Sequence, residues 1–85
     1  MDMRYAVYLH LELLEVIPKN SVQGRRILKF TRSLADDPFR DGDFTEKAAS
    51  LRSLQIKIVG DYAVTYWVDH PVKSVMVVNI CVADI

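Results

Sequence analysis

The stretch IKIVGDYAVTYWVDHPVKSVMVVNI, residues 56–80, contains most of three β-strands separated by two turns. Its β-branched and aromatic residues are typical of strands, and Gly60-Asp61 suits a two-residue hairpin loop because glycine accepts a positive φ. Asp69-His70-Pro71 supplies the second turn. The pattern predicts strands over residues 52–59, 62–69 and 74–82.

Working outward, the chain before this stretch predicts one strand and two helices. Residues 4–8 alternate as a short strand. The apolar residues of 9–18 fit both the alternation of a strand and the spacing of one helix face. The repeated Leu and Glu favour a helix, which Pro18 ends. Asn20-Ser21 can cap a second helix, which ends at Asp37-Pro38.

The second helix carries an apolar stripe at Ile27, Phe30 and Leu34. Residues 39–50 are rich in turn formers and acids, and are predicted to be a connecting loop. The expected fold is α+β, with the element order β-α-α-β-β-β. It consists of a small, mostly antiparallel sheet with an N-terminal helical hairpin packed on one face.

Composition limits the class of protein. The 85 residues, 1–85, predict a single domain, and the balance of 11 basic and 11 acidic residues argues against a basic coat over the whole surface. The one cysteine, Cys81, is expected to be buried and fits a reducing compartment. With no secretory signal and no stretch approaching about 20 apolar residues, we expect a soluble cytoplasmic protein without membrane association.

Strand alternation predicts two different faces of the sheet. Leu54, Ile56 and Ile58 are expected to bury against the helices together with Tyr62, Val64, Tyr66 and Val68. The other face would then carry Gln55 and Lys57, together with Ala63, Thr65 and Trp67 from the next strand.

The last strand is apolar on both sides, since Val75 and Val77 alternate with Met76, Val78 and Ile80. Two helices can cover only one face of the sheet, so we expect a partner on the other. That partner is either a second copy of the chain or a different protein, and ordinary surface hydrophobes are the alternative. The candidate partner-binding residues are Trp67, Met76, Val78 and Ile80.

Two segments, RRILKFTRSLADDPF (25–39) and LQIKIVGDYAVTYWVDHPVKSVMVVNI (54–80), resemble the RelE/ParE superfamily of bacterial toxins from toxin–antitoxin and plasmid-stabilisation systems. The resemblance rests on the basic helix running into Ala-Asp-Asp-Pro-Phe and on a strand pair of the form K-I-x-x-G-x-Y-x-V-x-Y. It implies a toxin held in check by an antitoxin segment that wraps it. RelE-like members cleave mRNA on the ribosome, and ParE-like members inhibit DNA gyrase.

Candidate RNA-binding residues follow from positive charge and from aromatic stacking. They are Arg25, Arg26, Lys29, Arg32, Arg52, Lys57 and Trp67. A solvated helix face is the plain alternative for the helical cations, and a solvated strand charge is the alternative for Lys57. No metal or cofactor is expected, because His10 and His70 lack ligand neighbours.

The resemblance also implies catalytic positions that this chain does not fill. Ala63 stands where RNA-cleaving members commonly carry arginine, Gln55 is neutral where they often have lysine, and no tyrosine-bearing basic segment follows residue 82. Loss of one donor to the transition state typically costs about 10²–10³ in rate. The catalytic residues therefore stay unassigned. Three alternatives remain. The first is growth inhibition by cleavage or binding of mRNA on the ribosome, as an endoribonuclease with weakened catalysis, and the others are a gyrase-directed action and a non-catalytic interaction module.

Overall fold

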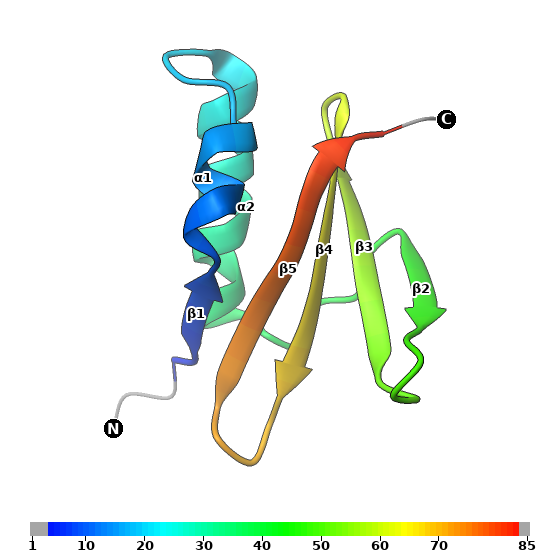
Figure 1. Ribbon diagram of the computed structural model, residues 1–85. Helices are drawn as coiled ribbons and strands as arrows, with labels where there is room; N and C mark the ends of the chain where they lie inside the picture. The colour runs from blue at the N-terminus through cyan, green and yellow to red at the C-terminus, as the bar shows by residue number, and fades with distance from the viewer. Residues whose placement is uncertain (1–3, 84–85) are drawn as a thin grey trace.

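The computed structural model describes residues 4–83 as one mixed sheet flanked by two helices (Figure 1). In chain order, the elements within these residues are β1 (Ala6–Leu9), α1 (Leu11–Val16), α2 (Val22–Asp36), β2 (Phe44–Lys47), β3 (Ser53–Val59), β4 (Tyr62–Asp69) and β5 (Ser74–Val82). The sheet order is β1-β5-β4-β3-β2, and β1–β5 is its parallel pair. The predicted α+β class and the mostly antiparallel sheet are confirmed.

β2 is an element that the sequence did not indicate. It lies inside the predicted loop 39–50 and pairs antiparallel with β3, with Phe44 opposite Ile56. All four of its side chains are exposed, so it carries no alternation of buried and exposed residues. A short edge strand of this kind is held by its backbone hydrogen bonds to the neighbouring strand, which leave no apolar pattern in the sequence.

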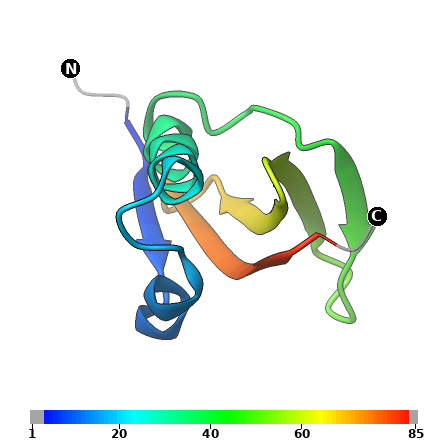
Figure 2. The same cartoon turned by 90° about the horizontal axis from the view of Figure 1, so that it is seen from above.

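α2 supplies most of the helical cover of the sheet. Its N-terminus is capped by the Ser21 side chain, which accepts a hydrogen bond from the Gly24 N–H at 3.0 Å. A Cβ at Gly24 would collide with the Pro18 carbonyl oxygen, so the chain can only turn this closely with glycine there. Figure 2 shows α2 on one face of the sheet beside β1 and β5, with no helix over β2.

α1 contributes less to the cover of the sheet than the predicted helical hairpin would. It has six residues, none of them buried, and it contacts β5. Neither helix within residues 4–83 is long and apolar enough to cross a lipid bilayer.

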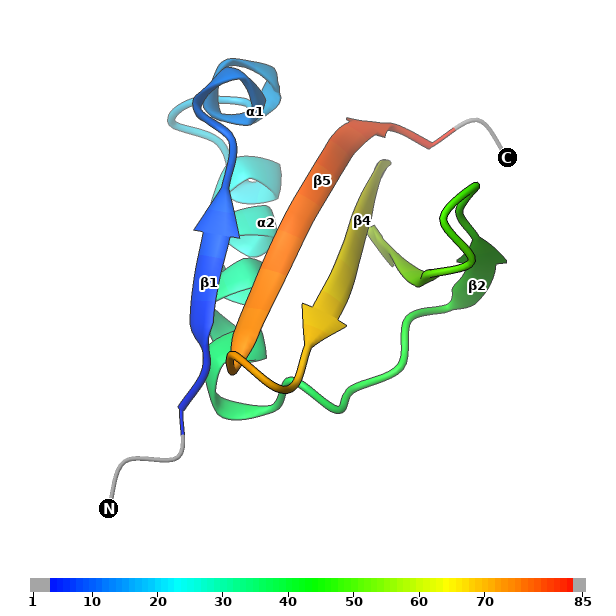
Figure 3. The same ribbon diagram turned by 60° about the horizontal axis from the view of Figure 1, so that its bottom comes forward.

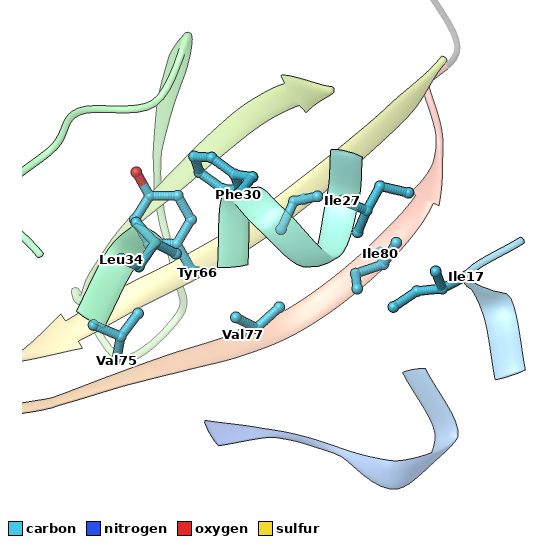
Figure 4. Packing of buried hydrophobic residues seen from close by; sticks show 9 residues of the cluster. Ile17, Ile27, Phe30, Leu34, Tyr66, Val75, Val77 and Ile80 are labelled. Carbon is cyan, nitrogen blue, oxygen red and sulfur yellow. The ribbon is translucent and has the colours of Figure 1, made fainter. Parts of the chain in front are cut away.

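The core lies between α2 and the middle of the sheet (Figure 4). The predicted stripe of α2 is confirmed, since Ile27, Phe30 and Leu34 are all buried. The Phe30 ring packs edge-on against Tyr66, with 5.8 Å between the ring centroids. The remaining core residues are Ile17, Val64, Val75, Val77 and Ile80. Burial of each large apolar side chain stabilises the fold by about 1.5–3 kcal/mol.

The predicted facing of β3 is wrong. The two-residue Gly60-Asp61 turn pairs Val59 with Tyr62, which places Lys57 opposite Val64. Directly paired residues share a face of the sheet, so Lys57 lies on the side covered by α2. Gln55, opposite Tyr66, lies there too, whereas Ile56 and Ile58 lie on the uncovered side.

The predicted orientation of Ile80 is also wrong, because β5 contains a bulge. Thr65 pairs with Asn79 but Tyr66 pairs with Val77, which leaves Val78 as an extra residue. The extra residue reverses the alternation, and Ile80 turns into the core with 2% of its surface exposed. For the same reason Cys81, predicted to be buried, is exposed.

Candidate functional site

Four cations surround a groove of about 480 Å³ between α2 and β3, on the helix-covered side of the sheet. We call it the basic groove and define it by Arg26, Lys29, Arg40 and Lys57. Its remaining wall consists of Phe30, Ser33, Ile58, Val59 and Gly60. A locally positive surface therefore exists on a chain whose formal net charge is zero.

Three separate segments place the cations of the groove. Arg26 and Lys29 are three residues apart on α2 and so share one helix face. Lys57 comes from β3, where the hairpin register turns it toward α2. Arg40 comes from the segment between α2 and β2, which the sequence offered only as a loop.

Arg40 is anchored on both its backbone and its side chain. The buried Tyr66 hydroxyl donates a hydrogen bond to the Arg40 carbonyl oxygen at 2.8 Å. The Arg40 guanidinium donates to the Ser33 hydroxyl at 3.1 Å and lies 3.6 Å from the Asp37 carboxylate. Burial raises the pKa of Tyr66 above its ordinary value, so this hydroxyl remains a donor through neutral pH.

One carboxylate, that of Asp43, balances Lys57 at the edge of the groove. Asp43 Oδ2 accepts a hydrogen bond from the Ile58 N–H at 2.8 Å, and Oδ1 lies 3.3 Å from Lys57 Nζ. The backbone bond first, and then Lys57, hold the pKa of Asp43 below its ordinary value. Asp43 is therefore ionised at neutral pH and partly neutralises Lys57.

The other predicted RNA-binding residues lie outside this groove. Arg25 is exposed and lines a different hollow beside Pro18, and Arg32 is exposed farther along α2. The Arg52 guanidinium stacks over the Trp67 ring, 3.6 Å from its centroid. The structure therefore brings Arg26, Lys29 and Lys57 together, adds Arg40, and separates Trp67 from all four.

Ala63 does not lie where the sequence placed it relative to Lys57. It pairs with Ile58 on one side and Cys81 on the other, so it faces away from α2. An arginine at this position would not enter the basic groove.

The uncovered side of the sheet is more apolar than predicted. In Figure 3, β1, β5 and β4 lie in front of α2, and no helix within the described residues covers their near side. We call this side the open face and define it by Tyr8, Phe44, Leu54, Ile56, Trp67 and Met76. Ile56 and Ile58 lie on this side, whereas Gln55 and Lys57 lie on the other. The open face therefore resembles a binding surface more than a solvated one.

A second hollow, of about 490 Å³, adjoins the open face where α1 approaches β5. Met76 and Val78 line it, with Tyr8 beside them. Trp67 pairs directly with Met76, so three of the four predicted partner-binding residues lie around this hollow and the adjoining sheet. Ile80 is the exception because it belongs to the core.

Within residues 4–83, no group of three or more His, Cys, Asp or Glu side chains could hold a metal ion. The basic groove offers fixed cations, an apolar floor, and the carboxylates of Asp37 and Asp43 beside two of the cations.

The fold is similar to that of chains in two toxin–antitoxin complexes of known structure. A chain of the archaeal RelE–RelB complex from Pyrococcus horikoshii OT3 matches with a TM-score of 0.73 and 24% identity, over 93% of this chain and 94% of that chain. A chain of the toxin–antitoxin complex RelBE2 from Mycobacterium tuberculosis matches with a TM-score of 0.72 and 17% identity, over 94% and 99%.

No protein-family model matches the sequence, and no curated protein does. The likeness to these two solved structures therefore confirms the predicted fold.

Proposed function

We propose that this protein is the toxin of a toxin–antitoxin pair, acting in the cytoplasm, and that its basic groove binds single-stranded RNA such as messenger RNA on the ribosome. The observation that carries the proposal is the convergence of Arg26, Lys29, Arg40 and Lys57 on one groove. Cations in a groove track a nucleic-acid backbone by neutralising phosphates. The fold shared with RelE–RelB over nearly the whole of both chains supports the same assignment.

The groove is better equipped to bind RNA than to cleave it. Cleavage by attack of a 2′-hydroxyl needs a proton acceptor as well as positive charge on the phosphorane. Two carboxylates are at hand. Asp37 lies 3.6 Å from the Arg40 guanidinium, and the lowered pKa of Asp43 makes it a weak base. The Tyr66 hydroxyl is engaged with the Arg40 carbonyl. We therefore expect binding with weak or no cleavage.

The open face is the proposed docking surface for the antitoxin. Trp67, Met76 and Val78 offer apolar contacts beside a hollow, and Phe44 and Tyr8 extend the surface toward both edges of the sheet. The RelE–RelB and RelBE2 matches come from toxin–antitoxin complexes, which supports a protein partner of this kind.

The test is induced expression in a bacterial host, following growth and messenger integrity by primer extension. We expect arrest with the wild-type chain, loss of arrest with the Lys29→Ala/Lys57→Met double variant, and retained arrest with Arg32→Ala, which removes an α2 cation outside the groove. Cleavage in register with codons would show a working nuclease. Normal growth with a folded wild-type protein would overturn the toxin assignment.

A second candidate is favoured by the apolar open face, namely a gyrase-directed inhibitor or a non-catalytic interaction module. The same growth experiment separates it from the first. Arrest that persists in the Lys29→Ala/Lys57→Met variant, with intact messenger and inhibited supercoiling by purified gyrase, would favour action on gyrase.

A further inference from the structure

Another hollow, of about 410 Å³, lies on the same side of the molecule as the basic groove. Arg40 lines both, so the hollow and the groove adjoin each other at Arg40. The lining of this hollow is polar and aromatic, and consists of Pro38, Phe39, Arg40, Asp41, Arg52, Ser53, Gln55, Val68 and His70.

Phe39 is the unusual residue of this hollow, because it is fixed in place while 71% of it remains exposed. Its ring stacks on His70, with 4.7 Å between centroids and 13° between planes. Tyr5 packs edge-on against both rings, and its hydroxyl lies 2.9 Å from His70 Nδ1. Two segments that are distant in the sequence, around Tyr5 and His70, thus hold one aromatic ring that remains largely exposed.

Polar groups around Phe39 suit a heteroaromatic ligand with attached phosphates. Gln55 Oε1 accepts hydrogen bonds from the Gly42 N–H at 2.9 Å and from the Thr45 hydroxyl at 3.2 Å. Because both bonds involve the oxygen, the Gln55 amide hydrogens can donate to a ligand. Asp41 can accept from an exocyclic amine, and Arg40 supplies positive charge.

We propose that Phe39 is a base-stacking subsite, and that a nucleobase of single-stranded RNA lies on its free face while neighbouring phosphates run past Arg40 into the basic groove. This inference rests on the proposed RNA binding and adds a specific contact to it. A single aromatic platform next to a cationic path is how proteins hold single strands without reading their sequence. An aromatic ring already fixed by its neighbours loses little conformational freedom when a base stacks on it.

The test is binding of fluorescein-labelled oligoribonucleotides to the full chain, measured by anisotropy over a range of salt concentrations. Phe39→Ala is expected to weaken binding by about 5- to 140-fold without changing the salt dependence, because stacking involves no phosphate. Phe39→Trp is expected to keep at least wild-type affinity, since it preserves the stacking surface.

Phe44→Ala is the matched control. Phe44 is also a largely exposed phenylalanine, with 56% exposure, but it pairs with Ile56 on the open face. We expect no change in RNA affinity. Lys29→Ala is the second comparison, and should lower the slope of log affinity against log salt by about 0.7, the value for one phosphate contact on a single strand.

Oligonucleotides with one abasic position then test the contact directly. Moving the abasic position along the strand should reveal a register in which wild-type protein loses affinity and Phe39→Ala protein loses none. Phe39→Leu, which keeps an apolar side chain, replaces Phe39→Ala if circular dichroism shows that the alanine variant is unfolded.

The outcomes separate this inference from the proposal beneath it. If Lys29→Ala weakens RNA binding but Phe39→Ala and Phe39→Leu do not, the stacking subsite is wrong and the groove assignment stands. If the wild-type chain binds none of the oligoribonucleotides, both are overturned.

Discussion

At the scale of single residues, Asp43 sets how much positive charge the basic groove presents. Its carboxylate holds Lys57 Nζ at 3.3 Å and the Ile58 N–H at 2.8 Å. Asp43→Asn removes the charge but keeps an oxygen for the backbone bond. We expect RNA affinity to rise about two- to five-fold at low salt, because Lys57 becomes free to meet a phosphate.

Asp36→Asn is the control for that change. It also removes one negative charge, but at the end of α2, where Asp36 lies 3.9 Å from Arg4 Nε. Equal gains from both variants, measured by anisotropy, would show a general charge effect and contradict the specific role of Asp43.

The lowered pKa of Asp43 also predicts a pH dependence of stability. The folded chain holds this carboxylate in its ionised form, so its contribution is fully present above the ordinary value of 3.8 and is lost as the pH falls through the lower folded pKa. Denaturation curves should be measured across pH 2 to 6, roughly the window set by that shift. As the pH falls, the free energy of unfolding should decrease less for Asp43→Asn than for wild type. An identical loss in both would contradict the assignment.

At the scale of elements, the bulge in β5 decides which residues form the core. Val78 and Ile80 would share a face in a regular strand, but the extra residue at Val78 turns Ile80 inward. Ile80→Ala should therefore lower the free energy of unfolding by about 2–5 kcal/mol through the cavity it leaves. Val78→Ala, at a site 46% exposed, should change it by less than about 0.5 kcal/mol.

Urea denaturation of the purified chain measures both variants. A large loss from Val78→Ala combined with a small loss from Ile80→Ala would mean that β5 runs without a bulge in solution. The predicted outward facing of Ile80 would then be restored.

At the scale of the whole molecule, two surfaces with different chemistry lie on opposite sides of one sheet. The basic groove lies on the side of α2, and the open face carries apolar side chains on the other. Because the sheet separates them, a change on the open face should leave the groove intact. A substitution on the open face is therefore expected to remove binding of the proposed antitoxin and to leave the proposed toxicity unchanged.

Met76→Glu is the variant that separates the two surfaces. We expect it to arrest growth like the wild-type chain, but to escape neutralisation by a co-expressed antitoxin encoded beside its gene, since a charge in the centre of an apolar contact is left without a partner. Val72→Glu, at an exposed apolar residue in the β4–β5 turn, is the control and should remain neutralised. Neutralisation of Met76→Glu as efficient as that of wild type would exclude this part of the open face as the docking surface.

The sequence by itself determined the local features of this protein. The three strands after residue 52, the Gly60-Asp61 turn, the capped α2 with its buried stripe, and the RelE/ParE resemblance all depend on patterns within a few residues or on their order. These patterns are readable because propensity, capping and periodicity act over short range.

Only the tertiary structure decided the faces and the site. Lys57 faces α2 because a two-residue turn fixes the register between β3 and β4, and Ile80 is buried because one residue bulges from β5. Either shift by one residue exchanges the two faces, since side chains alternate with period two. Arg40 and Phe39 join the site through contacts with Tyr66 and His70, which are far from them in the chain. Such contacts form only when separate segments pack together, and no local pattern encodes them.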